Sequence, residues 1–242
     1  MKLLLSVGVF LSSYQAQAQL VSTSDTSLLA SAVRTARQRY LANAPEMRLL
    51  NGVAYGRNVP SYVTGQPFFQ TSDPQPGTLE YDGQRFAGVQ LLYEQVEDQV
   101  LLYGPAQATP VQLIRQKVRA FEFGGHRFVH LPADSAGVLT EGFYEVVVNG
   151  PSQLLVKRAK KLEAATGGYA MKGEYEEITR FFVQRHNLFY EVATLKQALA
   201  ALGDKKAEMQ SYARSNRLRL TTDSREVSLA ALVRQYNALT TP

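Results

Sequence analysis

The chain contains no cysteine and no tryptophan among its 242 residues, and it has only three histidines. Without cysteine it can form no disulfide framework, no thiolate metal site and no cysteine nucleophile. Outside its first residues it also lacks a long apolar run, and a membrane-spanning helix needs about 20 such residues. These absences leave side-chain burial as the source of stability, and they predict a mature chain without a transmembrane anchor.

The first residues follow the pattern of a secretory signal, MKLLLSVGVFLSSYQAQA. Lys2 precedes a short apolar run, and Ala16 and Ala18 have the spacing that signal peptidase requires. Gln19 follows where a lipoprotein would carry its acylated cysteine. We therefore predict a signal peptide at residues 1–18, cleavage after Ala18, and an exported protein that is periplasmic or secreted.

Positive charge is in slight excess, with a formal net charge of +5 and a pI near 9.3. In a cytoplasmic protein this balance would suggest nucleic acid as a partner. For an exported chain, the expected partners are an envelope protein, a glycan or a lipid component, and nucleic acid is not expected.

The organisation of the mature chain changes along its length. Apolar residues at three- and four-residue steps predict an N-terminal amphipathic helix in residues 19–47, centred on 27–42. The punctuated stretch 49–76 predicts turns, and its aromatic residues are expected to pin this loop onto a sheet rather than to stack on a ligand. Residues 48–193 form a β-rich domain in this interpretation, and residues 194–242 form a helical segment.

Five turn signals divide the region 78–192 into alternating apolar and polar runs. Because each signal separates two runs, we predict an antiparallel β-meander of about ten strands, closed as a barrel or stacked as a sandwich. The segment 165–178 is interpreted as a polar, glycine-containing connection. The turn signals are Asp82–Gly83, Glu97–Asp98, Gly124–Gly125, Asn149–Gly150 and His186–Asn187.

The last 49 residues have helix signals: Thr194 and Asp204 as N-caps, and Asp223 with Glu226 in capping-box spacing. None of these helices is apolar all round, so they are expected to pack on the β-rich domain. The predicted fold class is α+β, a β-meander followed by packed C-terminal helices. The final helix is expected to bury one stripe, made of Leu229, Leu232, Val233, Tyr236 and Leu239.

Several segments occur in a recognisable order: LLNGVAYG, GTLEYDGQRFAGVQLLYEQVEDQV, GGHRFVHL, GFYEVVVNG followed by LLVKR, and paired helices after YEVATLKQAL. In this order the chain resembles, from about Leu49 to Leu239, a family of exported proteins that is common in Bacteroidetes and has no assigned activity. The resemblance implies an envelope protein and brings no catalytic residues with it.

Candidate catalytic and metal-binding residues are few. His126 and His130 lie four apart in a predicted strand, about 13 Å from each other, which is too far for one zinc ion. Glu141 and Glu145 have spacing that would place them on one face, but nothing in the sequence marks either as buried. No catalytic residue is assigned, and neither a metal nor a cofactor is expected.

The most cationic stretch of the chain contains Lys157, Arg158, Lys160 and Lys161. One interpretation is an anion-binding rim; the other is a strand end whose charges resist edge-to-edge pairing. Strand alternation places Lys157 and Arg158 on opposite faces, which argues against a single patch.

From the sequence we expect a non-enzymatic envelope protein that acts as a binding or interaction module. Two alternatives stay open. One is a carrier of a small apolar ligand with lipocalin-like architecture. The other is a glycan or peptide hydrolase whose acids come from separate strands.

Overall fold

The computed structural model describes residues 28–36, 49, 51–56, 59–104, 109–167 and 170–240. The chain divides into two units, Met1–Glu46 and Met47–Pro242, and each is considered by itself. The predicted signal peptide with Ala16 and Ala18 lies outside the described residues, as does most of segment 19–47.

The described part of the first unit is a helix at residues 28–36, inside the range 27–42 that the apolar spacing predicts. Its apolar side chains are exposed: Leu28 and Leu29 at 66 % and Val33 at 59 %. The described helix therefore buries no apolar face within its own unit.

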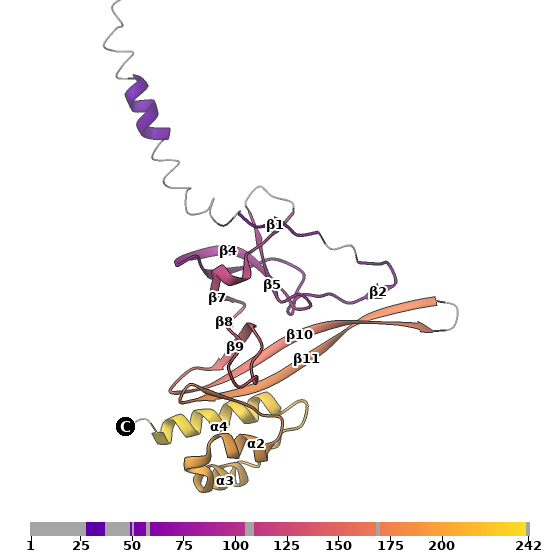
Figure 1. Cartoon of the computed structure of the whole chain (residues 1–242), viewed down its shortest axis with the longest axis vertical. Helices are drawn as coiled ribbons and strands as arrows, with labels where there is room; N and C mark the ends of the chain where they lie inside the picture. Colours follow the sequence, from indigo (N-terminus) through magenta and orange to yellow (C-terminus); the bar gives the residue numbers. More distant parts are fainter. Residues whose placement is uncertain are drawn as a thin grey trace, which may run out of the picture. The chain divides into compact units, whose positions relative to one another are not determined.

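The second unit consists of a 12-stranded sheet and the helices that follow it (Figure 1). The strands are β1 (Val53–Ala54), β2 (Val63–Thr64), β3 (Gln75–Tyr81), β4 (Gln84–Glu94), β5 (Gln99–Tyr103), β6 (Val111–Gln112), β7 (Val118–Phe123), β8 (His126–Leu131), β9 (Gly142–Val148), β10 (Ser152–Gly167), β11 (Ala170–Arg185) and β12 (Leu188–Glu191). The helical elements are η1 (Arg115–Lys117), α2 (Leu195–Ala201), η2 (Gly203–Lys205), α3 (Lys206–Ser215) and α4 (Arg225–Thr240).

The sheet joins two meanders, and the α+β prediction is confirmed. Its order is β1-β6-β5-β4-β3-β7-β8-β9-β10-β11-β12, with β2 paired in parallel to β11. After β6 the chain returns through η1, so that β7 pairs with β3 and starts the second meander. Within the described residues β1 and β12 do not pair, so the sheet is open, and of the two predicted forms it is not a closed barrel.

All five predicted turns lie between paired strands. Asp82 and Gly83 have φ values of 50° and 76° in the β3–β4 turn, and Asp98 has a φ of 56° between β4 and β5. Gly124 and Gly125 connect β7 to β8 with φ values of 57° and 80°. Glycine, aspartate and asparagine tolerate this left-handed backbone, which explains why these residue pairs predicted the turns correctly.

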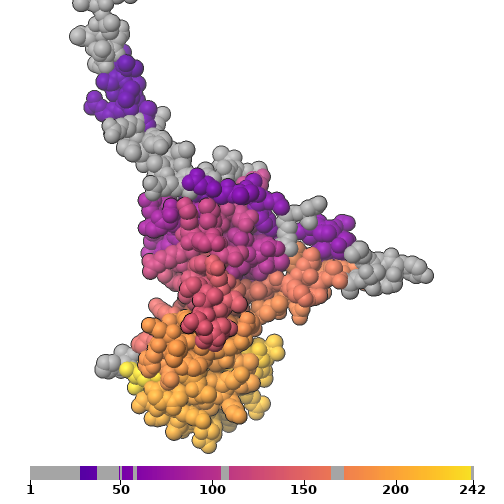
Figure 2. All heavy atoms as spheres, viewed as in Figure 1, coloured from indigo at the N-terminus to yellow at the C-terminus, as the bar shows by residue number. Residues whose placement is uncertain are grey.

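The prediction of a connection at residues 165–178 is wrong. Residues 165–167 continue β10 and residues 170–178 begin β11, and these two strands of 16 residues each pair along their whole length as a hairpin. We call the part of the sheet formed by strands β3–β5 and β7–β9 the β-rich body. Figure 2 shows the distal part of the hairpin projecting beside this body. In the described part of the hairpin strands, charged residues such as Lys160, Lys161 and Glu177 interrupt the apolar positions, so the apolar periodicity that normally reveals a strand is weak.

The inner half of the hairpin separates two apolar clusters. Leu154 and Val156 of β10 face the helices and pack with Leu229, Val233 and other buried residues of the helical segment. Leu155, between them, faces the other way and packs with Tyr144 and Phe182. Strand alternation thus gives β10 a helix-facing side and an opposite side.

A third cluster fills the β-rich body. Its centre consists of aromatic rings, among which Phe121 and Phe128 are stacked at 4.8 Å and Phe69 meets Phe128 edge-on at 5.2 Å. Phe69 comes from the loop between β2 and β3, and it is only 5 % exposed. As predicted for this loop, the aromatic side chain holds it against the sheet.

One of the predicted helix caps is confirmed, two predicted cap residues have other roles, and one residue of the predicted buried stripe is exposed. Thr194 forms the expected cap of α2, as a capping box with Gln197. Asp204 lies in η2 instead of capping a helix, and it accepts hydrogen bonds from Tyr236. Glu226 of α4 binds Arg158 of β10, and Leu239, expected in the buried stripe, is 44 % exposed. No helix in the described residues has the length and apolar character needed to cross a membrane.

Candidate functional site

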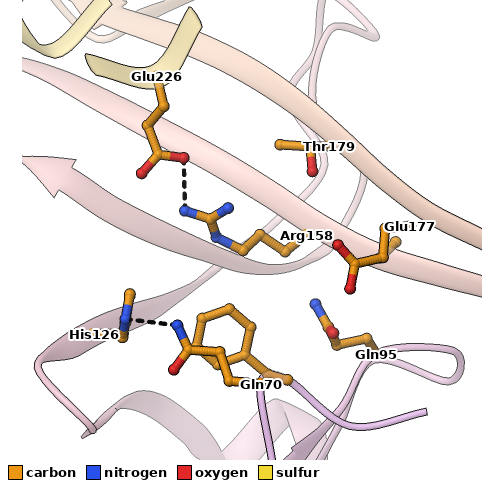
Figure 3. Close-up of a pocket in the computed structure, with 9 residues that line it drawn as sticks. Gln70, Gln95, His126, Arg158, Glu177, Thr179 and Glu226 are labelled. Atoms are coloured by element: carbon orange, nitrogen blue, oxygen red, sulfur yellow. Dashed lines mark hydrogen bonds and ion pairs between the residues drawn. The ribbon is translucent and has the colours of Figure 1, made fainter. Parts of the chain in front are cut away.

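A polar pocket of about 350 Å³ lies where the β-rich body, the hairpin and α4 meet (Figure 3). It brings together residues that are distant in the sequence and belong to two loops, three strands and one helix. The lining residues are Phe69, Gln70, Gln95, His126, Arg158, Ala159, Glu177, Thr179 and Glu226.

Arg158 is the central cation of the pocket. It lies on the helix-facing side of β10, and its Nε donates to Glu145 while its Nη2 donates to Glu226 over 2.8 Å. Its guanidinium also lies 5.8 Å from the ring centre of Phe69. Burial by itself would lower the pKa of Arg158, but the charges and hydrogen bonds of Glu145 and Glu226 raise it overall. Arg158 therefore stays charged and joins β9, β10 and α4.

Glu145 connects this arginine to a histidine. Its side chain is 7 % exposed, and its second oxygen lies 2.5 Å from His126 Nδ1. His126 Nε2 lies 3.0 Å from the amide nitrogen of Gln70, which can only donate. With the Gln70 amide in this orientation, Nε2 accepts from Gln70 and Nδ1 donates to Glu145. Gln70 and Glu145 together orient the imidazole at the wall of the pocket.

Lys160 fixes the loop that supplies Phe69 and Gln70. Its ammonium donates to the backbone oxygens of Gln66 and Phe68 over 3.1 and 2.9 Å, and it also lies 3.4 Å from Glu177. The loop is held from the other side because Phe69 N donates to Tyr93 O. Gln70 is thus positioned by the hairpin as well as by the sheet.

Lys157 occupies the opposite side of β10. Its ammonium donates to Asp98 over 2.7 Å and lies 5.0 Å from the ring centre of Tyr144. Burial lowers the pKa of Lys157, and the neighbouring Asp98 offsets only part of this effect. Asp98 also accepts from the Tyr93 hydroxyl over 2.6 Å, and burial followed by the charge of Asp98 raises the pKa of Tyr93 well above 10.0. This second ion pair lies outside the pocket.

The four cations of the predicted anion-binding rim are therefore not brought together. Arg158 lines the pocket, Lys160 supports its wall, and Lys157 faces away, as strand alternation predicted. Lys161 is 63 % exposed and pairs with Glu163 on the hairpin. Anion binding by these residues stays a prediction, but at Arg158 two carboxylates already occupy the positions that an anionic ligand would need.

Three lining or supporting residues were missed by sequence reasoning. Glu145 was noted only for its spacing from Glu141, which lies before β9 and is 48 % exposed. Glu226 was assigned to a helix cap, and Gln95 was not considered. Their roles depend on contacts across 13 to 68 residues of sequence, such as those from Arg158 to Glu145 and to Glu226, and no local pattern reports such contacts.

The histidines do not form a metal site in the part of the chain that the structure describes, where no group of three or more suitable ligands occurs. His126 and His130 both lie in β8, as expected, and they approach different carboxylates, Glu145 and Glu141. Among the described residues, none of the hydrogen-bond partners of His126 is a hydroxyl that it would activate as a nucleophile.

The hydrolase alternative requires a carboxylate pair in which one group donates a proton to the ligand. The pocket does contain carboxylates from separate elements, Glu177 of β11 and Glu226 of α4. Glu226 and the nearby Glu145 are both engaged by Arg158, so their oxygens are held by a cation rather than presented to a ligand.

Comparison with known proteins adds no function to this geometry. The chain matches no protein-family model, no curated protein and no solved structure.

Proposed function

We propose that the protein is exported and acts as a binding protein, and that its polar pocket holds a neutral, hydroxyl-rich ligand such as a sugar unit of an envelope glycan. The N-terminal signal pattern supports export. The resemblance to exported Bacteroidetes proteins supports a role in the envelope. The choice of ligand class rests on the side chains that line the pocket.

The observation that carries this proposal is the position of Gln95. The residue is only 5 % exposed, and its backbone N–H and C=O bind Pro67 O and Lys160 N. No hydrogen bond within the described residues occupies its side-chain amide, and Figure 3 shows this amide pointing toward the space between Arg158 and Glu177. An amide that borders a pocket and has no protein partner is satisfied there by water or by a ligand. A hydroxyl-rich ligand would replace that water.

The charges of the pocket favour a neutral ligand. Arg158 is compensated by two carboxylates, and the charge of Lys160 lies near that of Glu177. The remaining polar groups are the imidazole of His126 and the amides and hydroxyl of Gln70, Gln95 and Thr179, a set that contains both donors and acceptors. Hydroxyl groups of a sugar match this mixture of donors and acceptors, whereas an anion would compete with Glu226.

The carrier alternative has less support. A lipocalin-like carrier encloses its ligand in a closed barrel. The described sheet is open, and the interior of the β-rich body is filled by aromatic contacts such as Tyr93 with Phe128 at 5.0 Å.

The proposal is tested with a panel of neutral mono- and disaccharides, by calorimetry and by the shift in thermal unfolding temperature. We expect at least one sugar to bind the wild-type chain and Gln95→Met to weaken this binding at least tenfold. Because the amide has no protein partner, Gln95→Met should leave the free energy of unfolding within about 0.5 kcal/mol of the wild type.

The matched control is Gln90→Met, the same substitution at an exposed position of β4. It should leave sugar binding unchanged. The proposal is wrong if no sugar in the panel binds, or if the two substitutions affect binding equally.

A further inference from the structure

The positive charge of the protein is concentrated at its C-terminal end. Residues 194–242 contain eight basic and four acidic side chains, whereas residues 1–193 contain 18 basic and 17 acidic ones. The helical segment thus carries a net charge of +4 out of the total of +5. The polar pocket described above does not account for this asymmetry.

Part of this charge surrounds a second pocket, of about 300 Å³, between α2, α3 and the segment after α3. The floor of this arginine pocket is apolar and is formed by Leu195, Leu199, Ala213 and Leu218. Its rim carries three exposed arginines, Arg214, Arg217 and Arg219, together with Gln210.

The three arginines lack counterions in the part of the chain that the structure describes. The ion pairs of the helical segment involve other residues, such as Asp204 and Glu208. Arg214 Nε donates to the backbone oxygen of Gln210 over 3.4 Å, within its own helix. The guanidinium groups thus contrast with Arg158, which binds two carboxylates, and they are available to an anion from outside the chain.

The backbone that presents these arginines is well ordered by hydrogen bonds. Leu218 N donates to Ala213 O and Arg217 N to Arg214 O, a pattern that ends a helix with its next residue in the left-handed conformation. The oxygen of Arg219 accepts from the hydroxyls of Ser224 and Ser228, over 2.7 and 2.8 Å. The backbone that carries the rim is therefore held in one conformation by hydrogen bonds.

Arg217 occupies a position that favours glycine. Its φ is 52°, in the left-handed region where a side chain is strained and where helices most often place glycine. Glycine would end α3 at lower cost, so the folded state gains nothing from arginine at this position. Because the backbone at Arg217 is strained and would suit glycine better, we expect the arginine side chain to serve a function other than folding.

We propose that the arginine pocket docks the protein on an anionic phospholipid surface. The guanidinium groups bind head-group phosphates, which match their planar donors in pairs. The leucine floor contacts the aliphatic part of the same lipid. An anionic group attached directly to an aliphatic chain fits both halves of this pocket, whereas inorganic phosphate fits only the rim.

The test measures partition of the full chain onto vesicles of phosphatidylglycerol and of phosphatidylcholine by co-sedimentation. The ratio of the two partition coefficients reports anionic selectivity and cancels any apolar insertion common to both vesicles. We expect the wild type to prefer phosphatidylglycerol by at least tenfold at low salt. Arg217→Gly should reduce this preference about fivefold, because each basic side chain near an anionic surface contributes a comparable increment.

Arg217→Gly is suited to this test because it should not impair folding. Glycine relieves the left-handed strain, so the thermal unfolding temperature should stay equal or rise. The matched control is Arg119→Gln, which removes the same charge from a side chain of β7 that is 85 % exposed. It should change the preference less than twofold.

Two results would overturn the proposal. If Arg119→Gln lowers the preference as much as Arg217→Gly, net charge and not the arginine pocket binds the surface. If inorganic phosphate releases the protein from vesicles at concentrations where chloride of equal ionic strength does not, the pocket is a site for a soluble anion. Equal partition of the wild type on both vesicles would also contradict it.

Discussion

The two sides of β10 show how one strand places neighbouring cations in different surroundings. Lys157 is enclosed by Asp98, Tyr93 and Tyr144, and it has a single counterion. Arg158, the next residue, has two carboxylate partners and borders an open pocket. Burial therefore lowers the pKa of Lys157, whereas the pKa of Arg158 is raised. The difference shows that the number of partners and the access of solvent, rather than sequence position, decide what a buried cation contributes.

The largest effect is expected from removing the single counterion of Lys157. Asp98→Ala leaves a buried ammonium unpaired and removes the acceptor of the Tyr93 hydroxyl. We expect the free energy of unfolding to fall by about 3–5 kcal/mol, measured by urea denaturation.

The substitution to compare with it is Glu145→Ala, which removes one of the two carboxylates that bind Arg158 on the opposite side of β10. There Arg158 keeps Glu226 and the solvent of the pocket, so we expect a loss of about 2 kcal/mol. If Glu145→Ala costs as much as Asp98→Ala, the second carboxylate does not compensate Arg158, and the contrast between the two sides fails.

The pH dependence of stability should also distinguish the two cations. Between the lowered pKa of folded Lys157 and its ordinary value of 10.5, the unfolded chain binds the proton more tightly than the folded chain does. Raising the pH through this window therefore favours the folded state, by at most about 1.4 kcal/mol per pH unit. Arg158, with its raised pKa, adds no such slope.

This slope is measured as the difference in unfolding free energy between the wild type and Lys157→Met, at pH values below 10. Above pH 10, tyrosines of the unfolded chain ionise while Tyr93 resists ionisation, so a rise in pH there lowers the stability of both variants. An unchanged slope in Lys157→Met would show that another group produces it.

The smallest effect is expected at the exposed end of the arginine network. Glu226 is 37 % exposed, and Glu226→Gln leaves Arg158 bound to buried Glu145. The free energy of unfolding should fall by less than about 1 kcal/mol, as for other partly exposed ion pairs. A loss above 2 kcal/mol in thermal or urea unfolding would mean that α4 depends on this contact for docking.

Much of the β architecture was predictable from local signals. Pairs such as Asp82–Gly83 and Gly124–Gly125 favour left-handed backbone, so each indicated a hairpin without knowledge of its partners. The distal half of the hairpin β10–β11 was missed, because few of its described side chains are buried and its strands are joined by backbone pairing and by cross-strand contacts such as Lys160 with Glu177. Backbone pairing and ion pairs do not require apolar residues at every second position, so the sequence of this part lacks the pattern that indicates a strand.

The candidate site was less predictable. Arg158 was noted as a cation and placed on the correct side of its strand, but its partners lie 13 and 68 residues away. Gln95 is an ordinary residue of a turn until β10 and the loop before β3 enclose it. Such roles arise from burial, which a single sequence does not report for an isolated polar residue.

The sequence by itself determined the five turns, the alternation along most of the strands and the presence of the C-terminal helices, because backbone preferences and apolar periodicity act over a few residues. Only the tertiary structure decided that the sheet is open, that two adjacent cations differ, and that polar residues from distant elements meet in one pocket. The reason is physical: the energy of a buried charge or amide depends on the partners that surround it in space, and folding selects those partners from the whole chain.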